Sequence, residues 1–392
     1  MYRMALFPGF FLLVGATAQA EDVWDEPIGW ETSWTGESTV LIAPSEDESL
    51  LFRLNLGGEA NHVLDSGLEI GAVAAFAVEQ DHPQRAGFSG IVAAPLRPVI
   101  GVQGVFSGLG LSASSEDEGI RGSLETAYVY AQGGYGEIRI GRDAGIAKRF
   151  SEGAPSIFTT LSLGAPRLDP TGAAILRTDH DLTGPSAKIS YATPRIVGLK
   201  AGLSFTPEAN ARGLDRDPAR ILPGMPAVSI SNATEASVSF NHRFRSNGIR
   251  ARAAAAWSRA DVKAAPTAPS TYSDMTTWSA GGSLEWDGLV AGASWLQSDN
   301  GISGRPGDYS AWSAGLSKEA LGLTWGLEYG EENDDAVGLD GESLQVGASK
   351  AFGESLAIGA GYRRNSLAPS RAGVAEKMLG SEGIVIEITL SR

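Results

Sequence analysis

Apolar residues alternate with small or polar ones in segments of about 8 to 12 residues, the period of a strand with two different faces. In the last segment, Ile384, Ile386 and Ile388 share one face, and Glu387 and Thr389 share the other. Almost no segment shows the period of an amphipathic helix. The pattern therefore predicts an all-β protein.

Most segments repeat one design, with large apolar residues on one face and Gly, Ser, Ala or charged residues on the other. Too many such strands would have to share one core in a soluble sandwich. In a transmembrane antiparallel β-barrel, the apolar face contacts lipid, the polar face lines water and no edge strand is unpaired. Six tryptophans fit interfacial girdles, with core positions in a soluble β protein as the alternative: Trp257, Trp278, Trp286, Trp295, Trp312 and Trp325.

Two kinds of connector alternate along the chain. Seven short ones, such as 246–248 and 287–288, carry the Gly, Asn and Asp of tight hairpins, and longer polar stretches separate the hairpins. We expect sixteen strands, short periplasmic turns, long outer loops and both termini on the periplasmic side. The strands are expected at 34–42, 50–62, 68–79, 121–132, 137–142, 187–193, 199–206, 233–245, 249–260, 275–286, 289–298, 308–318, 323–330, 341–351, 355–363 and 383–391.

The stretch 99–111 is apolar enough to form a further strand inside the second long connector, 80–120. If this stretch pairs with a neighbouring strand, the barrel has eighteen strands. The pattern alone leaves that alternative open.

The start of the chain has the three parts of a secretory signal peptide: the base Arg3, an apolar run at 4–15 and small residues up to Ala20. A short transmembrane anchor is the alternative, but Pro8 interrupts the run and an anchor needs about 20 apolar residues. We expect a signal peptide at 1–20, cleaved after Ala20, and an outer-membrane barrel domain at 21–392.

Composition excludes several other classes. The absence of cysteine excludes a disulfide scaffold, and a mean hydropathy of -0.06 excludes a polytopic helical membrane protein. The formal net charge is -15, which disfavours nucleic acid or anionic lipid as a partner. Export without cysteine fits a protein of the bacterial envelope.

Two stretches resemble the general porins of Gram-negative bacteria, especially those of alphaproteobacteria. The first is AYVY at 127–130 followed by GGYGEIRIGR at 133–142, and the second is ISYATPR at 189–195. The resemblance covers most of the mature chain and implies a sixteen-stranded passive diffusion channel in the cell outer membrane. It also implies that the connector between the two stretches, 143–186, folds back into the barrel and narrows the channel.

The resemblance implies a homotrimer, in contact with outer-membrane lipid and lipopolysaccharide, that passes small hydrophilic solutes. We expect no cofactor, because nothing in the chain binds nucleotide or presents a catalytic set. The long connector 80–120 could latch a neighbouring subunit. One departure is the end of the chain, which finishes on Ser391 and Arg392 where porins commonly have an aromatic residue. A substrate-specific channel is the alternative; it would place aromatic residues in the lumen, whereas most aromatic residues here fall on the apolar face.

A pore discriminates by its width and by the field across its narrowest point, so acids on the inward loop are candidate selectivity residues. Glu152 and Asp169, in the middle of the loop, are the preferred acids, together with Asp143; Asp179 and Asp181 are further candidates. Each of these acids could instead face bulk water or cap a turn.

Side chains alternate between the two faces of each strand, and this alternation directs four bases toward the lumen: Arg53, Arg121, Arg139 and Lys188. Three of them, Arg53, Arg121 and Lys188, lie on strands that resemble those that supply the basic cluster in general porins. A second basic group flanks the turn 246–248 and is expected to line the periplasmic vestibule: Arg243, Arg245, Arg250 and Arg252. With acids and bases opposed at the constriction, we expect a transverse field and a weak overall preference for cations.

The chain has few of the residue patterns that catalysis requires. The chain contains no Gly-x-Ser-x-Gly turn, no His-Glu-x-x-His and no cysteine nucleophile, so we do not expect an enzyme. Asp179-His180-Asp181 is an acid–base cluster, with a hydrogen-bonded anchor of the loop as the alternative. The acidic stretches 116–118 and 331–335 could hold Ca²⁺, although solvated, repelling charge is the alternative and no EF-hand spacing occurs. A surface adhesin would show a fixed repeat, and none is visible.

Overall fold

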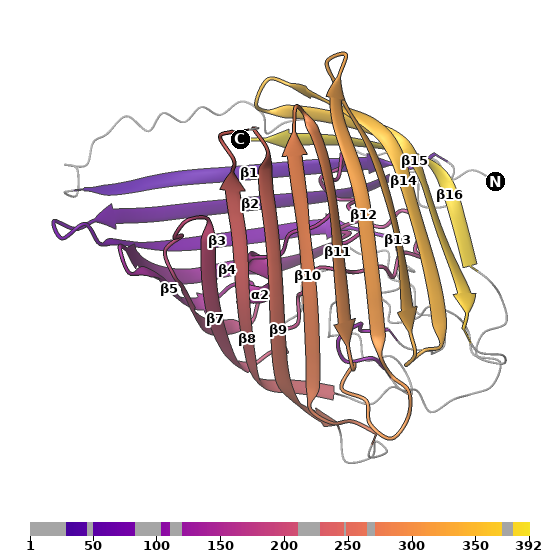
Figure 1. The fold of residues 1–392 in the computed structure, drawn as a ribbon, viewed down its shortest axis with the longest axis horizontal. Helices are drawn as coiled ribbons and strands as arrows, with labels where there is room; N and C mark the ends of the chain where they lie inside the picture. The colour runs from indigo at the N-terminus through magenta and orange to yellow at the C-terminus, as the bar shows by residue number, and fades with distance from the viewer. Residues whose placement is uncertain are drawn as a thin grey trace.

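The computed structural model describes residues 29–44, 50–82, 103–109, 120–210, 228–246, 248–264, 271–370 and 379–392. These residues form sixteen antiparallel strands in one closed barrel (Figure 1), which confirms the predicted count. The strands are β1 (Trp30–Ile42), β2 (Leu50–Val63), β3 (Glu69–Gln80), β4 (Arg121–Gly133), β5 (Gly136–Arg142), β6 (Ala187–Ala192), β7 (Leu199–Glu208), β8 (Val228–Arg243), β9 (Arg250–Ala264), β10 (Met275–Trp286), β11 (Leu289–Ser298), β12 (Tyr309–Ala320), β13 (Leu323–Asp334), β14 (Leu339–Phe352), β15 (Leu356–Pro369) and β16 (Leu379–Ser391).

The barrel closes because β1 pairs with β2 along its whole length and with β16 from Glu37↔Ser391 to Ile42↔Ile386. The short turns lie at one end of the barrel, which we name the turn end, and the longer connections lie at the other, which we name the loop end. For β8–β15 the turn end is at the top of Figure 1. The predicted signal peptide at 1–20 and the acidic stretch 116–118 lie outside the described residues.

The turn between β10 and β11 shows how the sequence sets the turn end. Its two central residues, Asp287 and Gly288, have φ values of 50° and 70°. Two-residue hairpin turns that follow the twist of the strands require positive φ at both positions, and Asp-Gly is a preferred pair there. The short Asp-Gly connector therefore specifies a tight hairpin.

The strands are longer at the loop end than the sequence pattern indicates. The stretch 331–340, expected to be an outer loop, is mostly paired: β13 ends at Asp334 and β14 begins at Leu339. Pairing of backbone groups needs no apolar face, so strands continue after the lipid-facing pattern stops. The alternation of polar residues at 331–340 is too weak a signal to predict that backbone pairing extends this far.

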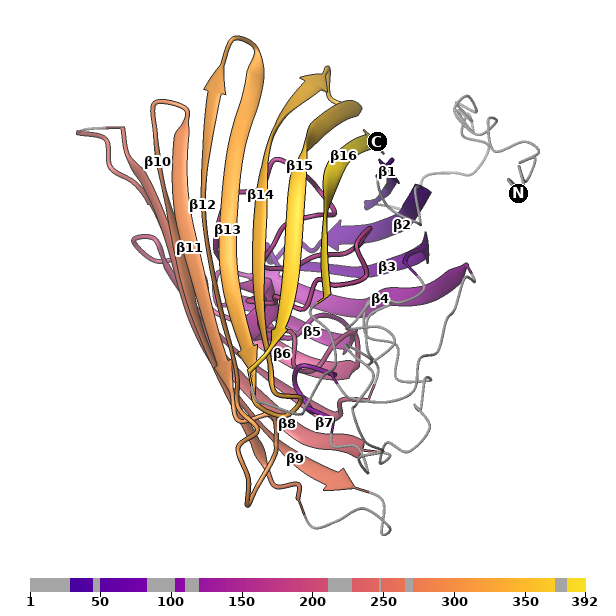
Figure 2. The same cartoon turned by 90° about the vertical axis from the view of Figure 1, so that its right-hand side faces the viewer.

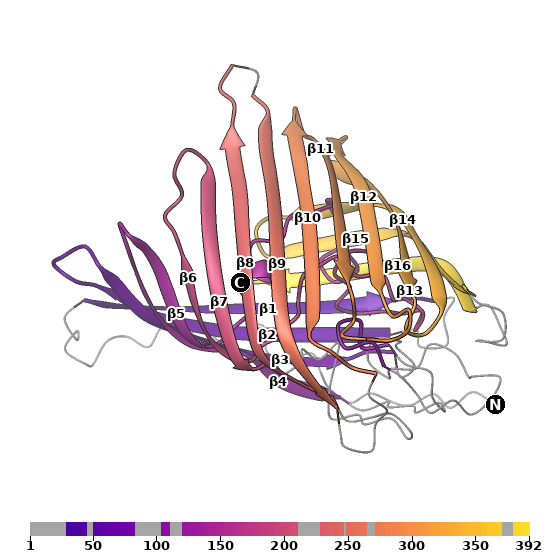
Figure 3. The ribbon, with the colours of Figure 1, turned by 60° about the horizontal axis from the view of Figure 1, so that its bottom comes forward.

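Large apolar side chains point outward around the barrel; Trp278 and Ile384, for example, are 55% and 60% exposed. Trp257 faces Trp278 across β9 and β10, and Trp295 faces Trp312 across β11 and β12. Two further tryptophans lie nearer the turn end, Trp286 and Trp325. These outward positions at two levels are those of interfacial aromatic girdles. The strands that carry them, β9–β13, lie side by side in Figure 3.

The inner surface of the barrel contacts parts of two long connections. The β5–β6 connection (143–186), which contains the short helix α2 (Ile146–Arg149), packs on inward-facing residues of β7–β16. Figure 2 shows this magenta segment within the ring of strands, behind β13–β16. Among the described residues, no helix is long and apolar enough to cross a membrane.

The described part of the 99–111 stretch, residues 103–109, is a turn and not a strand. Phe106 is fully buried and packs on Tyr309 of the inner wall, with ring centroids 5.9 Å apart. The described apolar residues of this stretch, Val105, Phe106 and Leu109, are buried inside the barrel. The closed sheet has sixteen strands, so the eighteen-strand alternative is wrong.

Candidate functional site

A row of inward-facing glycines on β10–β15 forms a groove in the inner wall, and residues 152–158 of the β5–β6 connection lie in it. A Cβ atom on Gly359 or Gly361 would come within 3.0 or 3.1 Å of the Phe158 ring, and one on Gly347 within 3.0 Å of Ile157. A Cβ on Gly281 or Gly292 would overlap backbone carbonyl groups of the loop. The groove consists of Gly281, Gly292, Gly315, Gly326, Gly347, Gly359 and Gly361. Its small residues bring the loop close to the wall.

Two buried side chains hold the two ends of the loop together. Glu235 on β8 is fully buried and accepts hydrogen bonds from the Ala147 backbone N–H at 3.2 Å and the Thr183 hydroxyl at 2.9 Å. Lys188 on β6 donates to the backbone carbonyls of Asp143 and of Gly184, the latter at 2.7 Å. Lys188 was predicted to line the pore wall, and the structure corrects this: it is 5% exposed and anchors the loop.

The middle of the loop is attached to two further acids that are buried on the wall. Glu387 on β16 accepts hydrogen bonds from the backbone N–H groups of Thr159 and Thr160, at 2.6 and 2.9 Å. Glu328 on β13 accepts one from the Leu163 N–H at 3.1 Å. These two carboxyl groups therefore fix the middle of the loop to the inner wall.

The Asp179-His180-Asp181 cluster also anchors the loop. His180 is fully buried, and its ring nitrogens are hydrogen-bonded to the hydroxyls of Ser279 and Ser258 at 2.8 and 2.7 Å. Asp181 accepts a hydrogen bond from Lys148 at 2.6 Å. Both ring nitrogens are occupied by wall hydroxyls, which matches the anchor interpretation of this cluster.

Asp169 does not face the channel, which corrects its prediction as a constriction acid. It is fully buried, and its carboxylate accepts hydrogen bonds from the Thr171 hydroxyl at 2.7 Å and the Ala174 N–H at 2.9 Å. Its own N–H donates to Asp81 at 2.9 Å. A carboxylate used to shape a local turn in this way has no oxygen directed at a passing ion.

Asp143 is also not a free acid at the constriction, because it is 6% exposed and forms an ion pair with Arg139 at 3.0 Å. Arg139 pairs in addition with Glu137 at 2.6 Å, and Glu137 pairs with Arg149 of α2 at 2.7 Å. Arg139 thus belongs to a network of alternating charges, not to an open basic wall.

The two other predicted wall bases are paired as well. Arg53 on β2 forms an ion pair with the fully buried Glu79 on β3 and lies 3.6 Å from Glu125 on β4. Arg121 lies 3.9 Å from the same Glu79. The antiparallel register places Glu79 beside both arginines. The predicted basic wall is therefore largely neutralised by Glu79 on the strand between the two arginines and by Glu125 on β4.

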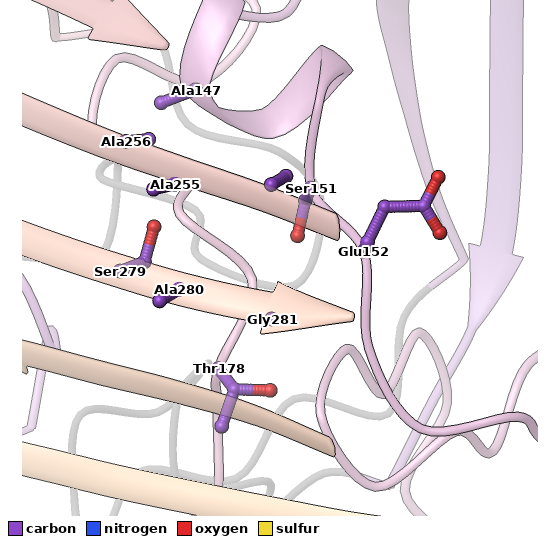
Figure 4. A pocket seen from close by; sticks show the side chains of 10 residues that line it. Ala147, Ser151, Glu152, Thr178, Ala255, Ala256, Ser279, Ala280 and Gly281 are labelled. Atoms are coloured by element: carbon purple, nitrogen blue, oxygen red, sulfur yellow. The ribbon is translucent and has the colours of Figure 1, made fainter. Parts of the chain in front are cut away.

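Glu152 differs from the other loop acids. It is half-buried, makes no salt bridge with any described residue, and its carboxylate points away from the small pocket between the loop and strands β9 and β10 (Figure 4). Burial raises the pKa of Glu152 above 4.5, while Arg252, Arg195 and Arg250 oppose that rise. Glu152 therefore lies in the electrostatic field of bases near the turn end, among them Arg252 of the predicted vestibule group.

Of that vestibule group, Arg243, Arg250 and Arg252 have the inward parity of β8 and β9, as predicted. Two nearby bases were not predicted. Arg195, in the β6–β7 turn, lies 3.4 Å from the Ser239 hydroxyl, and Lys200 pairs in register with Ser239 on β8. The sequence shows that Lys200 points inward and that Arg195 lies in a turn. Which bases of the neighbouring strands lie beside them depends on the sheet register.

Residues 103–109 form a second inward segment that the sequence did not predict. The side-chain carbonyl of Asn300 accepts hydrogen bonds from the N–H groups of Phe106 and Ser107 at 3.2 and 3.0 Å. Leu109 packs in a cluster with Leu339 and Leu367. The connector was predicted to latch a neighbouring subunit, but this part of it is bound inside its own barrel. The apolar pair Val105-Phe106 in the long connector was the sequence signal that could have indicated burial inside the barrel.

Among the described residues, no group of three or more His, Cys, Asp or Glu is arranged to hold a metal ion. In the stretch 331–335, Glu332 and Asp334 point inward and are buried, whereas Glu331 points outward. Alternation along a strand separates these acids onto two faces, so this stretch is not the clustered loop on which the Ca²⁺ prediction depended. Ca²⁺ binding at 116–118, which lies outside the described residues, stays a prediction.

An outward apolar surface, a closed sheet of sixteen strands and a polar lumen narrowed by an inserted loop together define an outer-membrane β-barrel channel. The chain belongs to the Gram-negative porin family, whose sequence profile matches residues 31–367. It is accordingly an outer-membrane protein that forms a channel for passive diffusion of small solutes. No curated protein sequence matches the chain significantly.

Solved porin structures have the same fold at low sequence identity. Salmonella typhi OmpF in complex with daunomycin has a TM-score of 0.59 and 10% identity, with 93% of this chain and 98% of that chain covered. The anion-selective porin from Comamonas acidovorans has a TM-score of 0.54 and 14% identity, with 93% and 99% covered. A trimer form of the Vibrio cholerae outer-membrane protein OmpT has a TM-score of 0.54 and 12% identity, with 93% and 100% covered.

Proposed function

We propose that this porin is a general diffusion channel in which the β5–β6 connection sets the size limit. The observation that carries the proposal is the fixed position of this loop, which is buried in the glycine groove and held by Glu235, Glu328 and Glu387. The loop leaves part of the opposite wall accessible: Asn55 and Tyr128 face inward and are partly exposed. Solutes pass between that wall and the loop.

The exposed surface of the loop is polar, since Ser151, Thr159 and Arg167 are exposed while Phe158 and Leu161 are buried against the wall. Polar groups on both sides of the passage favour water and hydrophilic solutes over apolar ones. No catalytic step and no cofactor are part of the proposal. Support comes from His180, the base of the acid–base cluster, whose two ring nitrogens already bind wall serines.

We also propose a homotrimer whose outer apolar band contacts outer-membrane lipid and lipopolysaccharide. The trimer form of Vibrio cholerae OmpT supports this assembly. Exposed outward residues such as Leu203 and Val238 provide the lipid- or subunit-facing surface. Unheated samples should migrate on a gel as a trimer and boiled samples as a monomer; an unheated folded monomer would contradict the proposal.

Liposome swelling tests the channel function. Refolded protein in liposomes should admit small sugars at rates that rise linearly with concentration and fall steeply with sugar size. Rates that saturate at low concentration of one sugar would instead favour a substrate-specific channel. Correctly folded protein with neither swelling activity nor conductance in planar bilayers would overturn the proposed function.

A further inference from the structure

Charged groups inside the barrel fall into two classes: those paired with an opposite charge and those without such a partner among the described residues. At the level of the loop, several bases are paired with acids. Arg139 binds Glu137 and Asp143, Lys148 binds Asp181 at 2.6 Å, and Arg53 binds Glu79. Paired charges largely cancel each other's field, so they attract a passing anion weakly.

Nearer the turn end, the bases have few partners. Arg195, Lys200 and Arg250 form no salt bridge with any described residue, and Arg252 reaches only Glu285, at 3.3 Å, with both side chains partly solvated. The polar atoms of β8 hold two of these bases in place: Arg195 donates to Ser239 at 3.4 Å, and Arg250 donates to Asn241 at 3.1 Å. We name these four bases the inner basic patch: Arg195, Lys200, Arg250 and Arg252.

The sheet register brings the patch together. Lys200 pairs with Ser239, and Asn241 pairs with Arg252, so the four bases surround two adjacent inward positions of β8. Arg243, opposite Arg250 in the register, extends the patch to the turn end. Bases from the turn after β6, from β7 and from β9 therefore converge on one side of the lumen.

One acid of the loop lies in the electrostatic field of the patch. Glu152 projects from the loop away from β9 and β10 (Figure 4), and its electrostatic partners are Arg252, Arg195 and Arg250. It forms no direct ion pair with them among the described residues. A carboxylate is thus already placed in the electrostatic field of the patch.

The wall formed by β2 and β3 has the opposite sign. Glu59 and Glu69 face inward there and share the hydroxyl of Tyr130, at 2.6 and 2.7 Å. Acids on this wall repel an anion toward the bases on β7–β9. The charge separation therefore lies on the turn side of the loop, not at the paired bases of the predicted constriction.

We propose that the inner basic patch binds the anionic group, carboxylate or phosphate, of small solutes in the periplasmic vestibule. This inference rests on the proposed channel function and names the class of solute that the channel favours. Guanidinium groups present paired donors that match carboxylate and phosphate oxygens, and Lys200 adds a point charge. The channel then prefers anions, in place of the weak cation preference expected from the sequence.

Planar-bilayer recording tests the patch with citrate and inorganic phosphate as probes. Either anion, added to one side, should reduce the KCl conductance at concentrations that have no effect from the other side. The variant Lys200→Gln/Arg250→Gln/Arg252→Gln should raise the half-blocking concentration about tenfold, because charge-assisted contacts are lost. Block by citrate alone would assign the patch to carboxylates, and block by phosphate alone would assign it to phosphates.

The matched control removes three bases that face outward, Arg259→Gln/Lys318→Gln/Lys350→Gln, and has the same net charge as the patch variant. The control should keep the block of the unmodified protein. Equal block from both sides, or an equal loss of block in the control variant, would overturn the proposed anion binding at the patch while leaving the channel function intact. If folded protein does not conduct, calorimetric titration with citrate and phosphate in detergent still decides binding, and no saturable heat would refute the patch.

Discussion

Detaching the loop from Glu387 is the most direct test of how this channel is narrowed. Glu387 is 4% exposed and accepts hydrogen bonds from the Thr159 and Thr160 N–H groups as well as from the Thr160 hydroxyl. Glu387→Ala removes the acceptor oxygens of all three hydrogen bonds at once. We expect the segment around Thr159 to leave the wall more often, because these three hydrogen bonds lose their acceptor.

The size of the effect follows from the bonds that are lost. Leaving a buried donor without an acceptor costs about 1 to 3 kcal/mol, and Thr160 is buried whereas Thr159 is exposed to water. A total of about 2 to 4 kcal/mol raises the detached population roughly 30- to 1,000-fold. Glu387→Gln keeps one carbonyl acceptor, so its effect should lie between those of the unmodified protein and Glu387→Ala.

Single-channel recording in planar bilayers measures this directly as open-channel noise and as the distribution of conductance levels. Glu387→Ala should show increased noise and additional levels, with Glu387→Gln intermediate. The control is Glu382→Ala on the same strand, whose exposed carboxylate binds Tyr362 on the outer surface at 2.6 Å. If folded Glu387→Ala recorded with the same noise and levels as Glu382→Ala, the anchoring role of Glu387 would be refuted.

Three further predictions follow. Gly326→Ala should lower stability by about 1 to 3 kcal/mol and change the conductance, because the added Cβ overlaps the loop; Gly134→Ala, with open space around it, should do neither in thermal melts and recordings. Because burial raises the pKa of Glu152 above 4.5, acidification from neutral pH should protonate it before an ordinary Glu and shift the reversal potential toward anions; a pH-dependent shift retained in Glu152→Gln would contradict this. Mass analysis of envelope-extracted protein should find Glu21 at the N-terminus, whereas retained Met1 would refute cleavage after Ala20.

The outer surface of the barrel could be predicted from the sequence. Alternation over two residues is a local property, so the strands, their outward faces and the tryptophan girdles could be predicted without any knowledge of the fold. Glycine and Asp-Gly turns specify hairpins through φ alone, which set the count of sixteen strands. The inward direction of Arg53, Arg121 and Arg252 followed from the same parity.

Parity gives the direction of a side chain but not its neighbours, and here the tertiary structure decided the chemistry of the lumen. Arg53 and Glu79 are 26 residues apart in the chain and meet only through the register of β2 and β3. The path of the loop, set by the glycine groove and by carboxylates as distant as Glu387, buried Asp169 and left Glu152 in the electrostatic field of the inner basic patch. The sequence by itself determined which charges point into the lumen. Only the folded chain determined which of them remain unpaired, because pairing depends on contacts between residues far apart in sequence.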